Sequence, residues 1–193
     1  MNYSEAMTSR NAKVLDAAKK VFARYGVGKT TMNDIAREAG VARQTLYNAY
    51  PGKDELLRAT VQHVADEILG AVTAAWEDAD TLDEKLDIFF RLGPLGWYDL
   101  VQSSPDVAEL LDGVHTVARE ELSVAHERWT ALFADLLRDH VPDGGASGLP
   151  VDDIAEFLYS ASTNAKYNAE SRVVLEKRLA VLKSSVLALL GRS

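Results

Sequence analysis

The sequence predicts an all-α fold. Apolar residues recur every three to four positions through most of the 193 residues, which is the period of a helix with one buried face. No stretch shows the strict alternation of apolar and polar residues expected of a half-buried strand. Clusters of glycine, proline and serine separate the periodic stretches. We therefore expect three N-terminal helices, of which the second and third are short, followed by a larger helical region.

Composition narrows the class of protein further. Apolar residues make up 47% of the chain and charged residues 26%, the balance of a globular protein with a sizeable core. There is no cysteine, which excludes disulfides, thiolate zinc sites and cysteine nucleophiles. No apolar stretch approaches the roughly 20 residues that span a bilayer, and Met1–Lys13 lacks the apolar region of a signal peptide. We expect a cytoplasmic protein without membrane contact.

The net charge of −8 hides an asymmetry along the chain. Residues 1–60 carry ten basic and six acidic side chains, a net charge of +4, whereas residues 61–193 carry eleven and twenty-three, a net charge of −12. A basic head on an acidic body points one end of a molecule at a polyanion such as DNA. Chance variation within an acidic protein is the alternative explanation.

The first elements are indicated by stop and cap residues. A helix of about Ser9–Tyr25 ends at Gly26-Val27-Gly28. Thr31 and Asp34 then have the spacing of a capping box, with aspartate in place of the usual glutamate. This box predicts a short helix that ends at Ala39.

A second short helix, about Ala42–Asn48, follows so closely that the two must cross at a steep angle. Ala36 is small enough for such a crossing, Gly40 tolerates the positive φ of the turn, and Leu46 is an apolar anchor that faces back. The remaining inward positions are Ile35, Ala39 and Val41. This spacing favours a helix-turn-helix, although an ordinary helical hairpin can also show it.

If Leu46 faces inward, the second helix presents Arg43, Gln44 and Tyr47 outward near its N-terminus, the end that enters the major groove of DNA. Arg43 can pair with a guanine edge and Gln44 with an adenine edge. The side chains suited to phosphate oxygens are Thr31, Thr45, Asn48 and Lys53. A solvated polar face on a core helix is the alternative.

The sequence from Lys53 onwards predicts further helices. They are expected at about Lys53–Glu77, Leu82–Leu92, two short helices within 94–112, Val114–His140, Val151–Asn168 and Ser171–Leu190, with a loop at Pro142–Pro150.

The last two helices offer a means of pairing with a second chain. The last one has an apolar stripe at 4-3-4 spacing, and the preceding one has an apolar face with small residues. Four such helices from two chains could form an interface. The predicted interface residues are Ile154, Leu158, Ala161, Ala165, Leu175, Leu179, Leu182 and Val186. Burial of the same faces against their own chain is the alternative.

Aromatic residues concentrate in the middle of the chain, and mostly apolar pockets are the usual ligand sites of helical bundles. Trp97 and Tyr98 follow the helix-breaking Gly93-Pro94-Leu95-Gly96, where side chains can face a cavity. Core packing explains the aromatic residues as well. The predicted pocket residues are Phe89, Phe90, Trp97, Tyr98, Trp129, Phe133 and Asn164.

The N-terminal segment resembles the DNA-binding domain of the TetR family of repressors. The matching stretch runs from Val21-Phe22 through Thr30-Thr31-Met32-Asn33-Asp34-Ile35-Ala36, Ala39-Gly40-Val41 and Thr45-Leu46-Tyr47 to Lys53-Asp54-Glu55-Leu56. The resemblance implies a homodimer that binds palindromic operator DNA and leaves it when a small, largely apolar or aromatic effector binds. It also implies base contacts by Arg43, Gln44 and Tyr47, and a division into a DNA-binding domain at 1–52 and an effector-binding and dimerisation domain at 53–193. Ala49 departs from the family, which usually has a histidine there.

The sequence leaves two other classes of protein to consider, an enzyme and a helical adaptor. An enzyme is disfavoured because the four histidines form no metal-binding spacing such as HExxH, and no phosphate loop or nucleophile motif is present. We accordingly expect neither a catalytic residue nor a cofactor nor a metal. A helical adaptor that binds a protein partner through its acidic body is the second alternative.

Overall fold

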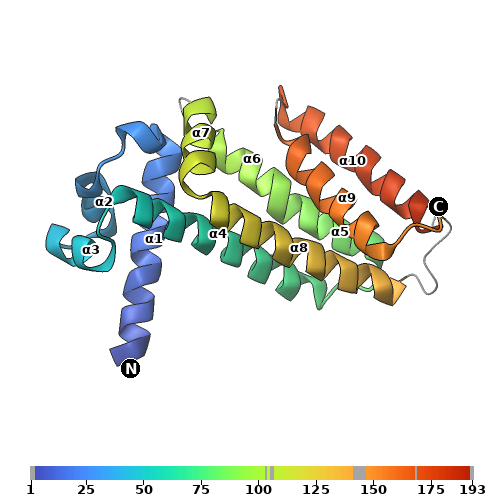
Figure 1. Cartoon of the computed structure of the whole chain (residues 1–193), viewed down its shortest axis with the longest axis horizontal. Coiled ribbons are helices and arrows are strands. Elements are labelled where there is room, and N and C mark those ends of the chain that lie inside the picture. Colours follow the sequence, from blue (N-terminus) through green and yellow to red (C-terminus); the bar gives the residue numbers. More distant parts are fainter. Residues whose placement is uncertain (1–2, 103, 105–106, 141–146, 168, 192–193) are drawn as a thin grey trace. The chain divides into compact units, whose positions relative to one another are not determined.

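The computed structural model describes residues 3–102, 104, 107–140, 147–167 and 169–191. Within these ranges the chain forms helices joined by turns and contains no strand, which confirms the all-α prediction (Figure 1). In chain order the elements are α1 (Tyr3–Lys29), α2 (Met32–Ala39), α3 (Arg43–Ala49), α4 (Lys53–Trp76), α5 (Leu82–Phe90), η1 (Arg91–Leu95), α6 (Gly96–Val101), α7 (Val107–Val117), α8 (Arg119–His140), α9 (Val151–Ala165) and α10 (Arg172–Leu189). None of these helices is both long and apolar enough to cross a membrane.

The chain packs as two compact units. The first comprises Met1–Glu67 and Leu100–Ser123, and the second comprises Ile68–Asp99 and Val124–Ser193. The long helices α4 and α8 each contribute residues to both units. These two packing units therefore have other boundaries than the two functional domains, which are expected to divide after residue 52. The functional division stays a prediction.

In the first unit, α1 begins at Tyr3, earlier than the expected Ser9. It is interrupted at Gly26, where the sequence predicted its end. Gly26 has φ +79° and ψ 169° and interrupts the helix. Val14, Ala18, Val21 and Phe22 are 0–4% exposed, so one face of the helix is buried over two turns.

Helix α7, far away in sequence, completes this unit against the end of α1. The Gly28 N–H donates to Glu109 Oε1 at 2.6 Å, and Arg58 Nε donates to the Val117 carbonyl at 3.1 Å. A β-carbon on Gly113 would lie 2.9 Å from Val27 Cβ, so the two helices approach as closely as glycine allows. The first unit is therefore built from two separate stretches of sequence.

The second unit has one apolar core, to which α5, α8, α9 and α10 all contribute. Helices α9 and α10 lie side by side (Figure 1). Phe89 is central, with its ring 4.7 Å from the Phe133 ring and 5.1 Å from the Trp129 ring between centroids. At the surface, Lys183 Nζ donates to Asp83 at 3.0 Å and to Asp87 at 2.8 Å, which joins α10 to α5.

Two expected boundaries differ from the structure, and a third lies partly outside the described residues. Gly93-Pro94 does not end the helix that begins at Leu82; the chain continues through the π-helical turn η1, whose wider hydrogen-bonding pattern accommodates a proline without an N–H. The helix expected over Val114–His140 is divided at Ala118, which is fully buried. Residues 141–146 of the expected loop lie outside the described residues, and Ser147–Pro150 are not helical.

Candidate DNA-binding interface

The start of α2 is held by the predicted capping box. Thr31 Oγ1 accepts from the Asp34 N–H at 3.3 Å, and Asp34 Oδ2 accepts from the Thr31 N–H at 3.2 Å. Asp34 also pairs with Arg37 one turn later. The hydrogen bonds from Thr31 and the charge of Arg37 lower the pKa of the Asp34 carboxyl below its usual value. The carboxylate that closes the box therefore stays charged well into the acidic range.

The turn after α2 has the geometry that the sequence predicted. Gly40 lies in the left-handed region at φ +65° and ψ 31°, and its N–H donates to the Ala36 and Arg37 carbonyls. Ile35 and Leu46 are fully buried and Ala36 is 4% exposed. The second helix therefore crosses the first over a small side chain and is anchored by Leu46.

Because Leu46 faces inward, the opposite side of α3 is open. Arg43 and Gln44 are exposed, and Tyr47 is half-buried. The Arg43 guanidinium lies over the Tyr47 ring, 5.2 Å from its centroid. Gln44 Nε2 donates to Asn48 Oδ1 at 2.8 Å. These i, i+4 contacts keep the polar groups of the helix extended along one face.

The predicted phosphate contacts occupy different environments. Thr45 is half-buried and Asn48 is exposed, whereas the Thr31 hydroxyl is engaged in the capping box. Lys53 Nζ donates to the Val27 carbonyl at 2.8 Å, so its ammonium binds the end of α1. A contact between Lys53 and a phosphate stays a prediction.

The sequence analysis gave no role to Thr30. In the structure this residue stabilises the turn at the end of α1. Its side chain is 2% exposed, and Oγ1 donates to the Gly26 carbonyl at 2.6 Å. The bond satisfies a carbonyl that the helix leaves open where it turns. Together with Lys53 it fixes the path of the chain from α1 into α2.

Most of the predicted pocket residues lie in the core of the second unit. Phe89, Phe90, Tyr98, Trp129 and Phe133 are 0–7% exposed. Trp97 is half-buried beneath the Lys166 ammonium, which lies 4.0 Å from its ring centroid. Asn164 is exposed, and its Nδ2 donates to the Ser160 carbonyl at 2.7 Å. Their mutual packing is that of core residues, and an effector contact by any of them stays a prediction.

The predicted dimer residues fall into two groups. Six of them are only 0–7% exposed because they form the core of their own chain, namely Ile154, Leu158, Leu175, Leu179, Leu182 and Val186. Such side chains leave little surface for a second chain, and their place in a dimer interface stays a prediction. Ala161 and Ala165 are half-buried. The apolar stripe marked the face of each helix that packs within the chain, which is the alternative that the sequence left open.

The exposed α3 over a buried anchor defines a DNA-binding protein of the helix-turn-helix class. Residues 14–60 match the pattern of bacterial regulatory proteins of the tetR family. An HTH-type transcriptional repressor from Mycobacterium tuberculosis is 30% identical over 142 residues, 66% of this chain and 74% of that protein. The chain belongs to the TetR family of transcription regulators, which are not enzymes.

Two further relatives agree with this assignment. The HTH-type transcriptional regulator BetI of Rhizobium meliloti is 26% identical over 153 residues, 79% of this chain and 72% of that protein. The crystal structure of a TetR-family regulator from Pectobacterium atrosepticum superimposes with a TM-score of 0.67 at 20% identity, covering 98% of each chain. The fold is therefore shared over 98% of the chain.

Proposed function

We propose that this protein is a ligand-responsive repressor that binds palindromic operator DNA as a homodimer and leaves it when a small, largely apolar or aromatic effector binds. The observation that carries the proposal is the open face of α3, with Arg43 and Gln44 exposed on a helix anchored by Leu46. The similar protein from Mycobacterium tuberculosis is named a repressor, which favours repression. The DNA target implies a cytoplasmic location.

Dimerisation is proposed through the outer face of α9 and α10. One helix-turn-helix rarely binds tightly alone, and two heads roughly 34–36 Å apart would reach successive major grooves. Phe157, Val173 and Val181 are 46%, 56% and 67% exposed, and all three lie on the paired helices α9 and α10. Each helix then packs one face in its own core and offers the other to the partner.

Effector binding is proposed within the second unit, whose aromatic residues include Trp97 and Tyr98 beside the π-helical turn. Helix α4 contributes residues to both units, so a ligand that moved it could change the spacing of the two heads. The coupling between effector and DNA must be reciprocal and is typically about 1–3 kcal/mol.

The test is a footprint on the DNA that flanks the protein's own gene. We expect protection of a palindrome whose half-sites are about one helical turn apart. The variant with Arg43→Ala and Gln44→Ala should keep its fold, since both side chains are exposed, but lose the protected site. Equal binding to scrambled DNA by the wild-type protein would refute the proposal and favour an adaptor.

A further inference from the structure

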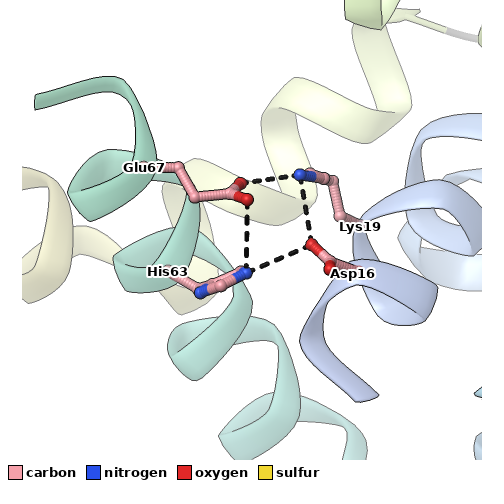
Figure 2. A network of polar contacts seen from close by, with 4 residues as sticks. All are labelled: Asp16, Lys19, His63 and Glu67. Atoms are coloured by element: carbon pink, nitrogen blue, oxygen red, sulfur yellow. Dashed lines mark hydrogen bonds and ion pairs between the residues drawn. The ribbon is translucent and has the colours of Figure 1, made fainter. Parts of the chain in front are cut away.

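Four charged or ionisable side chains meet between α1 and α4 within the first unit (Figure 2). Asp16 and Lys19 come from α1, while His63 and Glu67 are one turn apart on α4. His63 Nε2 lies 3.2 Å from Asp16 Oδ1 and 3.6 Å from Glu67 Oε1. These three groups have ligand atoms within 4.8 Å of one another, so an imidazole and two carboxylates surround a common space.

The two separations from His63 Nε2 suit a metal ion. Zinc bonds of about 2.0–2.1 Å in a tetrahedral arrangement put neighbouring ligand atoms about 3.3–3.4 Å apart. The two separations from His63 Nε2, 3.2 Å and 3.6 Å, lie within a few tenths of an ångström of that value. One nitrogen and two carboxylate oxygens form the open three-ligand set that leaves a fourth position for water.

A cation already occupies this cluster. Lys19 Nζ lies 2.6 Å from Glu67 Oε2 and 3.4 Å from Asp16 Oδ1. The lysine side chain is 23% exposed, and those of Asp16 and Glu67 are 45% and 43% exposed. The ammonium sits on a flexible stem, and its partial exposure lets it leave towards solvent.

We propose that Asp16, His63 and Glu67 bind a divalent transition-metal ion such as zinc, with the ion replacing the Lys19 ammonium. Zinc and lysine then compete for the same two carboxylates. The bound ion would join α1, which leads into the DNA-reading helices, to α4 through bonds stronger than an ion pair between half-exposed side chains. The proposal is independent of which operator or effector the protein recognises.

A second histidine pair supplies a matched control. His126 Nε2 lies 2.7 Å from Glu156 Oε2 in the second unit, at an exposed site between α8 and α9. The other groups on this carboxylate are the hydroxyls of Thr130 and Ser160. Among the described residues, the pair therefore provides the same imidazole–carboxylate contact as His63 but without a third ligand group.

The test is titration of the chelator-treated full-length protein with zinc chloride by calorimetry, and with cobalt(II) by visible absorption. We expect one ion per chain at this site, affinity reduced about 100-fold or more by His63→Gln or Asp16→Asn, and no change for His126→Gln. Lys19→Gln should bind zinc more tightly, by about tenfold or more, because the competing ammonium is gone.

The Lys19→Gln variant distinguishes loss of a metal ligand from loss of the fold, because a misfolded variant would not bind zinc more tightly. Circular dichroism of each variant checks its helix content. Equal zinc affinity of wild type and His63→Gln, or a Lys19→Gln variant that binds zinc no more tightly than wild type, would overturn the proposal.

Discussion

Arg43 begins α3 with its guanidinium over the Tyr47 ring and its charge exposed. A guanidinium held in this way loses little side-chain freedom when it pairs with a base, because its orientation is already restricted. Gln44, in turn, must give up its bond to Asn48 before it can read an adenine edge. On binding DNA, Gln44 therefore has to break a hydrogen bond within the protein, whereas Arg43 loses little side-chain freedom.

The substitution Arg43→Ala should cost about 1–3 kcal/mol of discrimination between operator and scrambled DNA. Arg37→Ala is the matched control: it removes the same charge from the same unit, but at α2, where Arg37 pairs with Asp34. The control should weaken binding to both DNAs alike. Fluorescence anisotropy titrations on the two DNAs measure the difference, and an unchanged ratio for Arg43→Ala would contradict a base contact.

Lys166 caps the end of α9 with its ammonium over Trp97. Burial lowers the pKa of this amine to about 8, against about 10.4 in an unfolded chain. Between these values the unfolded chain holds a proton that the folded chain has lost, so stability rises with pH. Below pH 8 the buried charge imposes a constant cost.

Relative to Lys166→Met, the wild-type protein should therefore gain about 1–2 kcal/mol of unfolding free energy between pH 7 and pH 9.5. Burial raises the pKa of neighbouring Tyr167, so the phenol stays neutral in this range and leaves the comparison unaffected. Urea denaturation at several pH values provides the measurement. Parallel stability curves for the two proteins would show that the amine is not desolvated.

At the scale of single elements, the turn between α2 and α3 requires a left-handed backbone conformation at Gly40. A β-carbon added to Gly40 meets nothing within 4 Å, and the same is true of Gly70 within α4. Yet Gly40 has φ +65°, whereas Gly70 is helical. The two glycines thus differ in conformation and not in available space.

Gly40→Ala should destabilise the protein by about 1–2 kcal/mol, because a side chain is strained in the left-handed region. Gly70→Ala should stabilise it by about 0.5–1 kcal/mol, because alanine is the better helix former. Opposite shifts of the thermal midpoint relative to wild type are expected. Shifts of the same sign would mean that packing, and not backbone conformation, decides both effects.

Local signals predicted the helix-turn-helix well because its geometry is set by near neighbours. Thr31 caps through Asp34, and Gly40 turns the chain that Leu46 anchors. The sequence pattern failed at Gly93-Pro94, where packing in the core keeps the chain helical through a wider turn. Short-range preferences do not reveal such a tertiary effect.

Long-range contacts were the part that sequence reasoning missed. A search for paired histidines could not find His63 beside Asp16, because the two are 47 positions apart and on different helices. Likewise, Leu158 and Val181 are both apolar, and only the packing of α9 and α10 shows that one is buried and the other 67% exposed. Periodicity identifies an apolar face but not the chain against which it packs.

At the scale of the whole molecule, the exposed valines allow the proposed dimer to be tested. Val181→Asp would bring like charges together across a two-fold interface and should give a monomer at micromolar concentration. Val124→Asp, at a 47% exposed position of α8, introduces the same charge elsewhere. Sedimentation velocity distinguishes the species. A wild-type monomer, or equal dissociation of both variants, would argue against an interface at α10.

The contact of α7 with the end of α1 limits how the DNA-binding helices of one regulator can be joined to the body of another. Glu109 and Gly113 lie against Gly28 and Val27 respectively, although the two pairs are more than eighty positions apart. In a chimera with a single junction near residue 52, α1 comes from one protein and α7 from the other. The α7 side chains would then contact an α1 to which they are not matched. Transplanting DNA specificity without loss of stability therefore calls for two crossovers, so that residues 100–123 travel with the N-terminal segment.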